Sequence, residues 1–115
     1  MAQDDFLIIV YKFLKRLYSD LKSGTQSDLA EIVSDKQMFP INDSYWAAIL
    51  EDLTKKGYIQ GASVQRLSKE NVRIISGNDF RITMDGVEYL TENSTMRKIA
   101  DVVGGIAGAV VSFIK

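Results

Sequence analysis

Apolar residues near the beginning of the chain repeat with the period of an α-helix. Between Asp4 and Lys22 they form two neighbouring stripes with three- and four-residue spacing. The first stripe is Phe6, Val10, Phe13, Leu17 and Leu21, and the second is Leu7, Tyr11, Leu14 and Tyr18. An apolar arc this wide exceeds what a helix needs to face one small core. We therefore expect this helix to pack against neighbours on two sides.

Two more helices are predicted before residue 57. Gly24 is typical of the end of the first helix, and Thr25 or Ser27 can cap a short second helix. Pro40 then interrupts the helical pattern, and Asn42 can cap a third helix that stops at Gly57. The inward side of this third helix is predicted to be Trp46, Ile49, Leu50 and Leu53. The second and third helices have the proportions of a helix-turn-helix.

After Gly57 the pattern changes to that of short strands. YIQGASVQRL and VRII, separated by the turn-like SKEN, predict a hairpin, and SGND at residues 76–79 predicts a second turn. In FRITMDGVEYL, Thr83 can cap a further helix. Gly86 costs that helix about 1 kcal/mol relative to Ala, so we expect another segment to pack closely against it. Asn93 or Ser94 can cap a last helix that runs through the C-terminus.

This order of elements predicts a mainly α fold with a small β-hairpin, an α+β winged helix-turn-helix with an extra C-terminal helix. We expect a winged-helix domain at residues 1–93 and an apolar, glycine-rich helix at residues 94–115. The core is predicted to include Trp46, Ile49, Leu50, Leu53, Ile59, Ile82 and Val87.

Two segments carry a resemblance to a known family. In LEDLTKKGYI a recognition-type helix ends at a glycine and enters a wing strand, and in ITMDGVEYL the wing leads into a helix. With them, residues 45–98 resemble the YjcQ family of small phage-associated and bacterial proteins. The resemblance implies a winged-helix fold and a phage or prophage origin, and it implies little about mechanism. The segment VVGGIAGAVVSFIK departs from it, because it is more apolar and richer in glycine.

Composition argues against an enzyme. The 115 residues, enough for one domain, include no Cys and no His, which excludes disulfides and thiolate zinc sites and removes the commonest general base. Acidic pairs such as Glu51 and Asp52 are adjacent, so on a helix they cannot bracket a scissile bond. Glycines 104–108 lack the strand and the Gly-Lys-Ser/Thr of a phosphate loop. We expect no catalysis, no metal, no cofactor and no small-molecule substrate.

The two ends of the chain predict a cytoplasmic protein. MAQDDF is acidic where a signal peptide needs basic residues, and Lys12 interrupts the apolar run that follows. The apolar run from Val102 to Ile114 would form a helix of about 20 Å, against a bilayer core of about 30 Å. This argues against a membrane span.

Charge distribution predicts a DNA contact. The net charge is -1, but Lys55 to Arg81 holds six basic and two acidic residues, a local balance of +4. The predicted DNA contacts are Tyr45, Ala48, Lys55, Lys56, Arg66, Lys69 and Arg73, with the wing giving most of the affinity to double-stranded DNA. The acidic residues of the third helix argue against contacts with DNA bases, because the duplex is also negatively charged. The alternative function is a protein-protein interaction module that does not bind DNA. A face that unites Lys55, Arg66, Lys69 and Arg73 with that helix would favour DNA.

Small residues predict an oligomer contact in the last helix. Ala100, Gly104, Gly108 and Ser112 recur every four residues, a spacing that lets two helices approach closely. The surplus apolar arc of the first helix is the nearest partner for this stripe. We predict a homodimer through the first and last helices, with packing inside one chain as the alternative.

Overall fold

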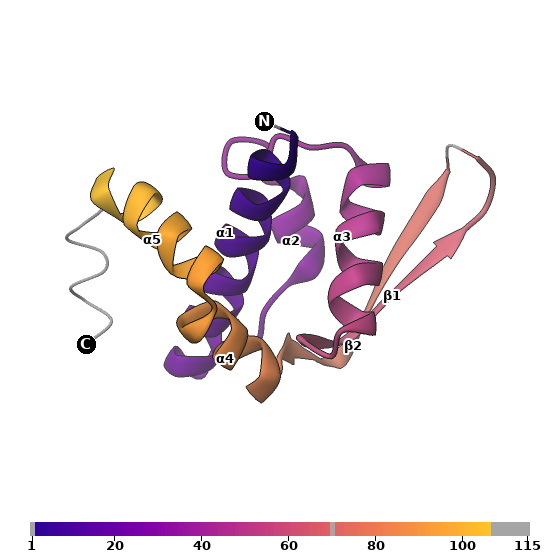
Figure 1. Ribbon diagram of the computed structural model, residues 1–115. Helices are drawn as coiled ribbons and strands as arrows, with labels where there is room; N and C mark the ends of the chain where they lie inside the picture. Colours follow the sequence, from indigo (N-terminus) through magenta and orange to yellow (C-terminus); the bar gives the residue numbers. More distant parts are fainter. Residues whose placement is uncertain (1, 70, 107–115) are drawn as a thin grey trace.

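The computed structural model describes residues 2–69 and 71–106 and confirms the winged-helix layout (Figure 1). Its elements are α1 (Ala2–Ser23), α2 (Leu29–Ser34), α3 (Asp43–Lys55), β1 (Ile59–Arg66), β2 (Val72–Ile82), α4 (Met84–Glu92) and α5 (Ser94–Ile106). Helix α1 lies in the middle, with α3 on one side and with α4 and α5 on the other. The hairpin of β1 and β2 projects beyond α3 as the wing.

Local capping fixes where three of the helices begin. The Asn42 side chain accepts a hydrogen bond from the Tyr45 amide at 2.8 Å, and the Thr83 hydroxyl accepts one from the Gly86 amide at 3.1 Å. Asn93 accepts from two amides of the first turn of α5. These predicted caps are confirmed, and each satisfies backbone donors that the helix leaves unpaired.

The predicted cap of α2 is wrong. Asp28, and neither Thr25 nor Ser27, caps this helix by accepting from the Glu31 amide at 3.2 Å. Ser27 is buried, and its hydroxyl donates to Asp20 Oδ2 at 2.8 Å. The contact with α1 therefore leaves the capping position to the next residue.

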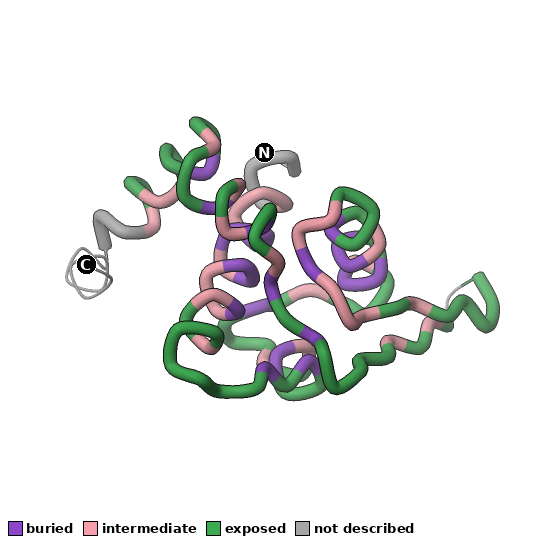
Figure 2. The backbone as a smooth tube through the Cα atoms, turned by 90° about the horizontal axis from the view of Figure 1, so that it is seen from below, coloured by how far each residue is buried: buried purple, intermediate pink, exposed green. Residues whose placement is uncertain are grey.

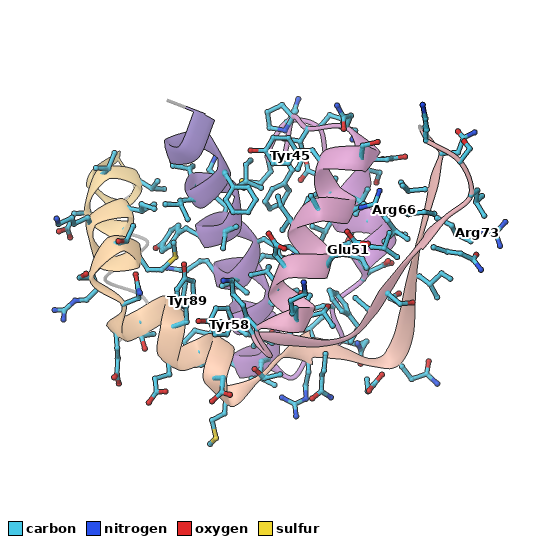
Figure 3. All side chains as sticks on the ribbon, turned by 45° about the vertical axis from the view of Figure 1, so that its right-hand side comes forward. Tyr45, Glu51, Tyr58, Arg66, Arg73 and Tyr89 are labelled. Atoms are coloured by element: carbon cyan, nitrogen blue, oxygen red, sulfur yellow. The ribbon has the colours of Figure 1, made fainter. Side chains whose placement is uncertain are left out.

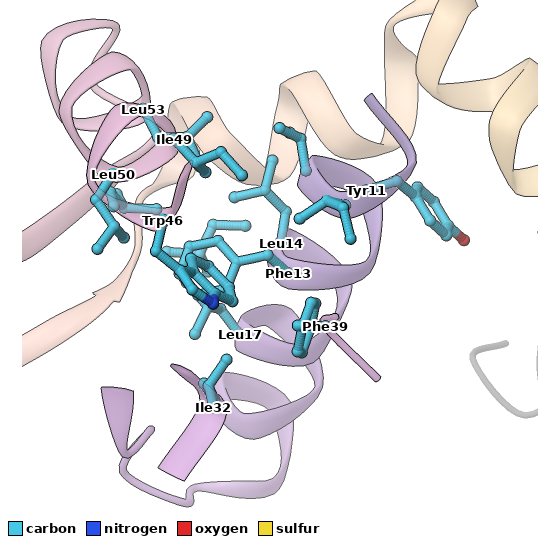
Figure 4. Close-up of a cluster of buried hydrophobic side chains, with 14 of the residues drawn as sticks. Tyr11, Phe13, Leu14, Leu17, Ile32, Phe39, Trp46, Ile49, Leu50 and Leu53 are labelled. Atoms are coloured by element: carbon cyan, nitrogen blue, oxygen red, sulfur yellow. The ribbon is translucent and has the colours of Figure 1, made fainter. Parts of the chain in front are cut away.

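The core surrounds Trp46, whose side chain is fully buried. Its ring meets Phe13 of α1 and Phe39 edge-on, with centroid distances of 5.1 and 5.2 Å (Figure 4). All the predicted core residues are buried except Val87, which is partly buried and packs against the others. Buried positions concentrate where the helices face one another, and the wing is mostly exposed (Figure 2).

Helix α1 packs on two sides, as its two stripes predict. Phe13 faces the core beside α3, and contacts with α4 and α5 cover another side of the helix. Leu21 is the exception in the first stripe, because it is 43% exposed near the C-terminal end of α1. Much of the wide apolar arc is thus satisfied within one chain.

The second turn predicted at residues 76–79 is absent from the hairpin. Strand β2 continues through this segment, and its partners shift from Gln60↔Arg81 to Ala62↔Ser76. Because β1 advances two residues while β2 changes by five, residues 77–80 of β2 lie opposite Gly61 alone, three more than a regular ladder would place there, and they form a bulge. Gly61 has a φ of +80°, and a Cβ there would lie 2.5 Å from the Phe80 backbone. The turn-like residues therefore serve a bulge, which bends a strand without reversing it.

The close packing predicted at Gly86 is confirmed. A Cβ on this buried residue would collide with the Tyr58 carbonyl oxygen and lie 2.7 Å from Ile82 Cγ1. The same carbonyl accepts a hydrogen bond from the Thr83 amide at 3.0 Å. Gly86 thus lets α4 dock onto the entry to the wing. Within residues 2–69 and 71–106, no helix has the length and apolar character that crossing a bilayer requires.

Candidate functional site

The candidate site is the exposed side of α3 together with the wing, which we call the α3–wing surface. On α3 the small residues Ser44 and Ala48 are exposed near the N-terminal end. Ala47 is fully buried, although it is not among the residues predicted for the inward side of this helix. Because α3 packs against both the core and the hairpin, its buried arc is wider than the sequence pattern indicates. Tyr45 is half-buried, and its ring stacks on Phe6 with centroids 6.2 Å apart.

Acidic residues dominate the charge of α3. Asp43, Glu51 and Asp52 lie on it, and no Lys or Arg occurs before Lys55 in its last turn. Arg66 of β1 donates from Nη2 to Glu51 Oε1 at 2.6 Å (Figure 3). The two side chains are 50% and 42% exposed, so solvent screens this ion pair. The wing cation nearest α3 is therefore already paired.

The hairpin register separates the cations of the wing. Val64 and Ile74 are paired, half-buried and packed against the core, which identifies the inner face of the hairpin. Arg66 lies two residues after Val64 and so shares this inner face, whereas Arg73 lies next to Ile74 and points to the outer face. Figure 3 shows Arg66 beside Glu51 and Arg73 directed away from α3.

The other predicted DNA contacts are spread over the wing and the end of α3. Lys69 is exposed in the loop between the strands, and Lys55 and Lys56 are exposed where α3 ends. The structure brings Lys55 and Arg66 to the α3 side of the wing, and it places Arg73 on the other side. The four cations Lys55, Arg66, Lys69 and Arg73 do not share one face.

A groove that the sequence pattern did not predict runs between α3 and β1. Its walls are Leu50, Glu51, Thr54 and Lys55 of α3 and Ala62, Ser63 and Val64 of β1. We call it the α3–β1 groove. Most of its exposed lining is apolar. The uncharged GASVQ run at residues 61–65 indicates a strand without charges to prevent strand addition. The groove itself could not be predicted, because it depends on how α3 packs beside β1.

The predicted oligomer contacts lie in α5 and beyond it. Met96 is fully buried, and Ile99, Ala100 and Val103 pack against the core, so this side of α5 faces its own chain. Gly104 lies in α5, whereas Gly108 and Ser112 fall outside the described residues. Val102 is 69% exposed on α5. The homodimer stays a prediction.

Titratable groups with shifted pKa values lie away from the α3–wing surface. Burial raises the pKa of Tyr11, and burial together with the neighbouring Tyr58 raises the pKa of Tyr89. Burial, with a smaller effect from Lys22, lowers the pKa of Lys15. Among the residues that the structure describes, no three His, Cys, Asp or Glu side chains are grouped to hold a metal ion.

Comparison with known proteins supports the resemblance seen in the wing. No curated protein and no solved structure matches the chain. The family model described as YjcQ protein matches residues 11–106, from the middle of α1 to the end of α5. Because this match covers most of the sequence, the chain belongs to the YjcQ family.

Proposed function

We propose that this YjcQ protein is a winged-helix interaction module whose α3–wing surface binds another protein. The ion pair between Arg66 and Glu51 carries the proposal. A winged helix that binds duplex DNA neutralises phosphates with free cations, and each contact adds to the affinity. Here Arg66 would have to exchange Glu51 for a phosphate, leaving an additional negative charge beside the duplex.

The rest of α3 supports the same conclusion. Asp43 and Asp52 would repel the phosphate backbone, and no Arg on α3 is available to read guanine. Ser44 and Ala48 instead have small, exposed side chains, so a partner protein can approach the helix closely there. Polar and charged groups around such a centre are typical of protein interfaces, where they fix orientation and partner choice.

Site-specific photocrosslinking in the native host tests this proposal. A photoreactive phenylalanine analogue would replace Ala48 at the centre of the surface and, as a matched control, exposed Glu88 on α4. We expect a discrete protein adduct from position 48 that survives nuclease treatment, and no such adduct from position 88. A nuclease-sensitive adduct at position 48, or identical results at both positions, would contradict the proposal.

DNA binding through the wing is a second candidate, and the exposed cations Lys69 and Arg73 favour it. The side chain of Arg73 forms no ion pair among the described residues, and its Nη1 donates to the neutral Gln65 Oε1 at 3.5 Å. In this case, affinity should be weak and fall steeply with salt. The K69A/R73A double variant would then remove about two phosphate contacts and flatten the salt dependence, whereas R66A alone would change it little because Arg66 is paired.

A further inference from the structure

We infer that the α3–β1 groove binds an extended segment of the partner, which adds to the free edge of β1 as a third strand. The inference rests on the proposed interaction function and names the site and the form of its ligand. Among the residues that the structure describes, the sheet consists of β1 and β2, so β1 has one edge without a neighbouring strand. At such an edge the backbone N–H and C=O groups of alternate residues point outward and can pair with another chain.

Beyond the bulge at Gly61, the edge of β1 lacks the charged and proline residues that usually protect an edge strand. Residues 61–65 contain no charge and no Pro, the features that commonly prevent strand addition. Within the described part of the chain, no hydrogen bond ties the backbone of Ala62, Ser63 or Val64 to anything outside the hairpin. By contrast, β2 is tied to the segment before α2, because Gln26 Nε2 donates to the Phe80 carbonyl at 2.9 Å.

The α3 wall provides a place for the side chains of an added strand. Alternate side chains of an extended segment point to opposite faces. One set would lie in the α3–β1 groove against Leu50, Thr54 and Val64, and the other set would face solvent. Strand addition beside a wall with side-chain pockets combines backbone affinity with side-chain selectivity. The ligand is therefore an extended segment with apolar residues at every second position.

Charge in the groove adds an acidic residue to this description. Glu51 is neutralised by Arg66, whereas Lys55 has no ion-pair partner among the residues the structure describes. The unpaired ammonium leaves the groove with positive charge at the C-terminal end of α3. A carboxylate placed there in the ligand would pair with Lys55 and set the register of the added strand.

A displayed library of random peptides about ten residues long, enough to span the edge of β1, is the probe. Peptides selected on the wild-type protein would be measured on Thr54→Trp, which fills the groove, and on Glu88→Trp, the control at an exposed position of α4 outside the α3–wing surface. We expect alternating apolar residues with an acid, and a loss of about tenfold or more with Thr54→Trp alone. Lys55→Glu should also weaken binding, and Lys56→Glu should not.

Backbone methylation distinguishes strand addition from other ways of filling the groove. In an added strand, the N–H groups of every second residue point toward β1 and the others point away. N-methylation of the first set should abolish binding, and N-methylation of the second set should leave binding unchanged. The inference would be overturned if the peptides bound Thr54→Trp as tightly as the wild-type protein, or if sensitivity to N-methylation did not alternate along the peptide. The proposed interaction function would not be affected by either result. Failure to select any peptide also overturns the inference. The proposed function would fall only with the photocrosslinking result, through a nuclease-sensitive adduct at position 48 or identical results at positions 48 and 88.

Discussion

Gly86 shows how a single residue couples α4 to the wing. Any side chain there meets the backbone carbonyl of Tyr58, which cannot rotate away as the end of a side chain can. Gly86→Ala gains about 1 kcal/mol of helix propensity but costs about 3 kcal/mol through overpacking. The expected net loss is about 2 kcal/mol in the free energy of unfolding, measured by urea denaturation.

A matched substitution separates packing from propensity at Gly86. Ala48→Gly on the exposed side of α3 should destabilise the protein by about 1 kcal/mol through propensity alone. If Gly86→Ala instead stabilises the protein by a similar amount, this result would contradict the close packing of the Tyr58 carbonyl against Gly86.

Residues whose role depends on near neighbours were predictable from the sequence. Asn42, Thr83 and Asn93 cap the helices that follow them, because capping needs only a side-chain oxygen and the next few amides. Asp28 was missed as a cap because the competing Ser27 donates to Asp20, seven residues earlier on α1. That competition is tertiary, and no local pattern reveals it.

At the scale of elements, the wing is one long hairpin with a bulge, whereas its sequence indicates two turns. Gly, Asn and Asp in residues 76–79 favour a turn and a bulge alike, and only the pairing with β1 decides between them. The same pairing places Arg66 and Arg73 on opposite faces. A local charge balance in the sequence therefore could not predict a common cationic face.

Two glycines with similar backbone angles test the bulge. Gly57 and Gly61 have φ values of +79° and +80°, but only Gly61 has backbone atoms of Phe80 within reach of a new Cβ. Gly57→Ala should cost about 1–2 kcal/mol through left-handed strain, and Gly61→Ala about 3 kcal/mol or more because overpacking adds to it. Denaturant midpoints measure both, and equal losses would contradict the bulge geometry.

At the scale of the whole molecule, α5 packs against α1 and α4 in its own chain. This contact satisfies much of the apolar arc on α1 that motivated a homodimer. Among the described residues of α1 and α5, Leu21 and Val102 remain exposed to a second copy. Gly104→Leu with Gly108→Leu should obstruct close helix approach while raising helix propensity.

Light scattering across a concentration series tests the dimer. The predicted result is a dimer for the wild-type protein and a monomer for the double variant. A wild-type monomer at every concentration would contradict the dimer, and a dimer unaffected by the two substitutions would remove the glycine stripe as its seam.

The central claim is that the α3–wing surface binds protein, because its acids and the pairing of Arg66 make it a poor surface for DNA. Fluorescence anisotropy of labelled duplex DNA tests this most directly, with the wild-type protein compared with Glu51→Gln/Asp52→Asn at low and physiological salt. We predict that wild-type binding at physiological salt is no tighter than the non-specific range of about 10⁻⁶ to 10⁻⁴ M. The double variant, which frees Arg66 and removes two negative charges, should bind more tightly at low salt. Wild-type binding in the nanomolar range to one duplex, unchanged by the double substitution, would contradict the claim.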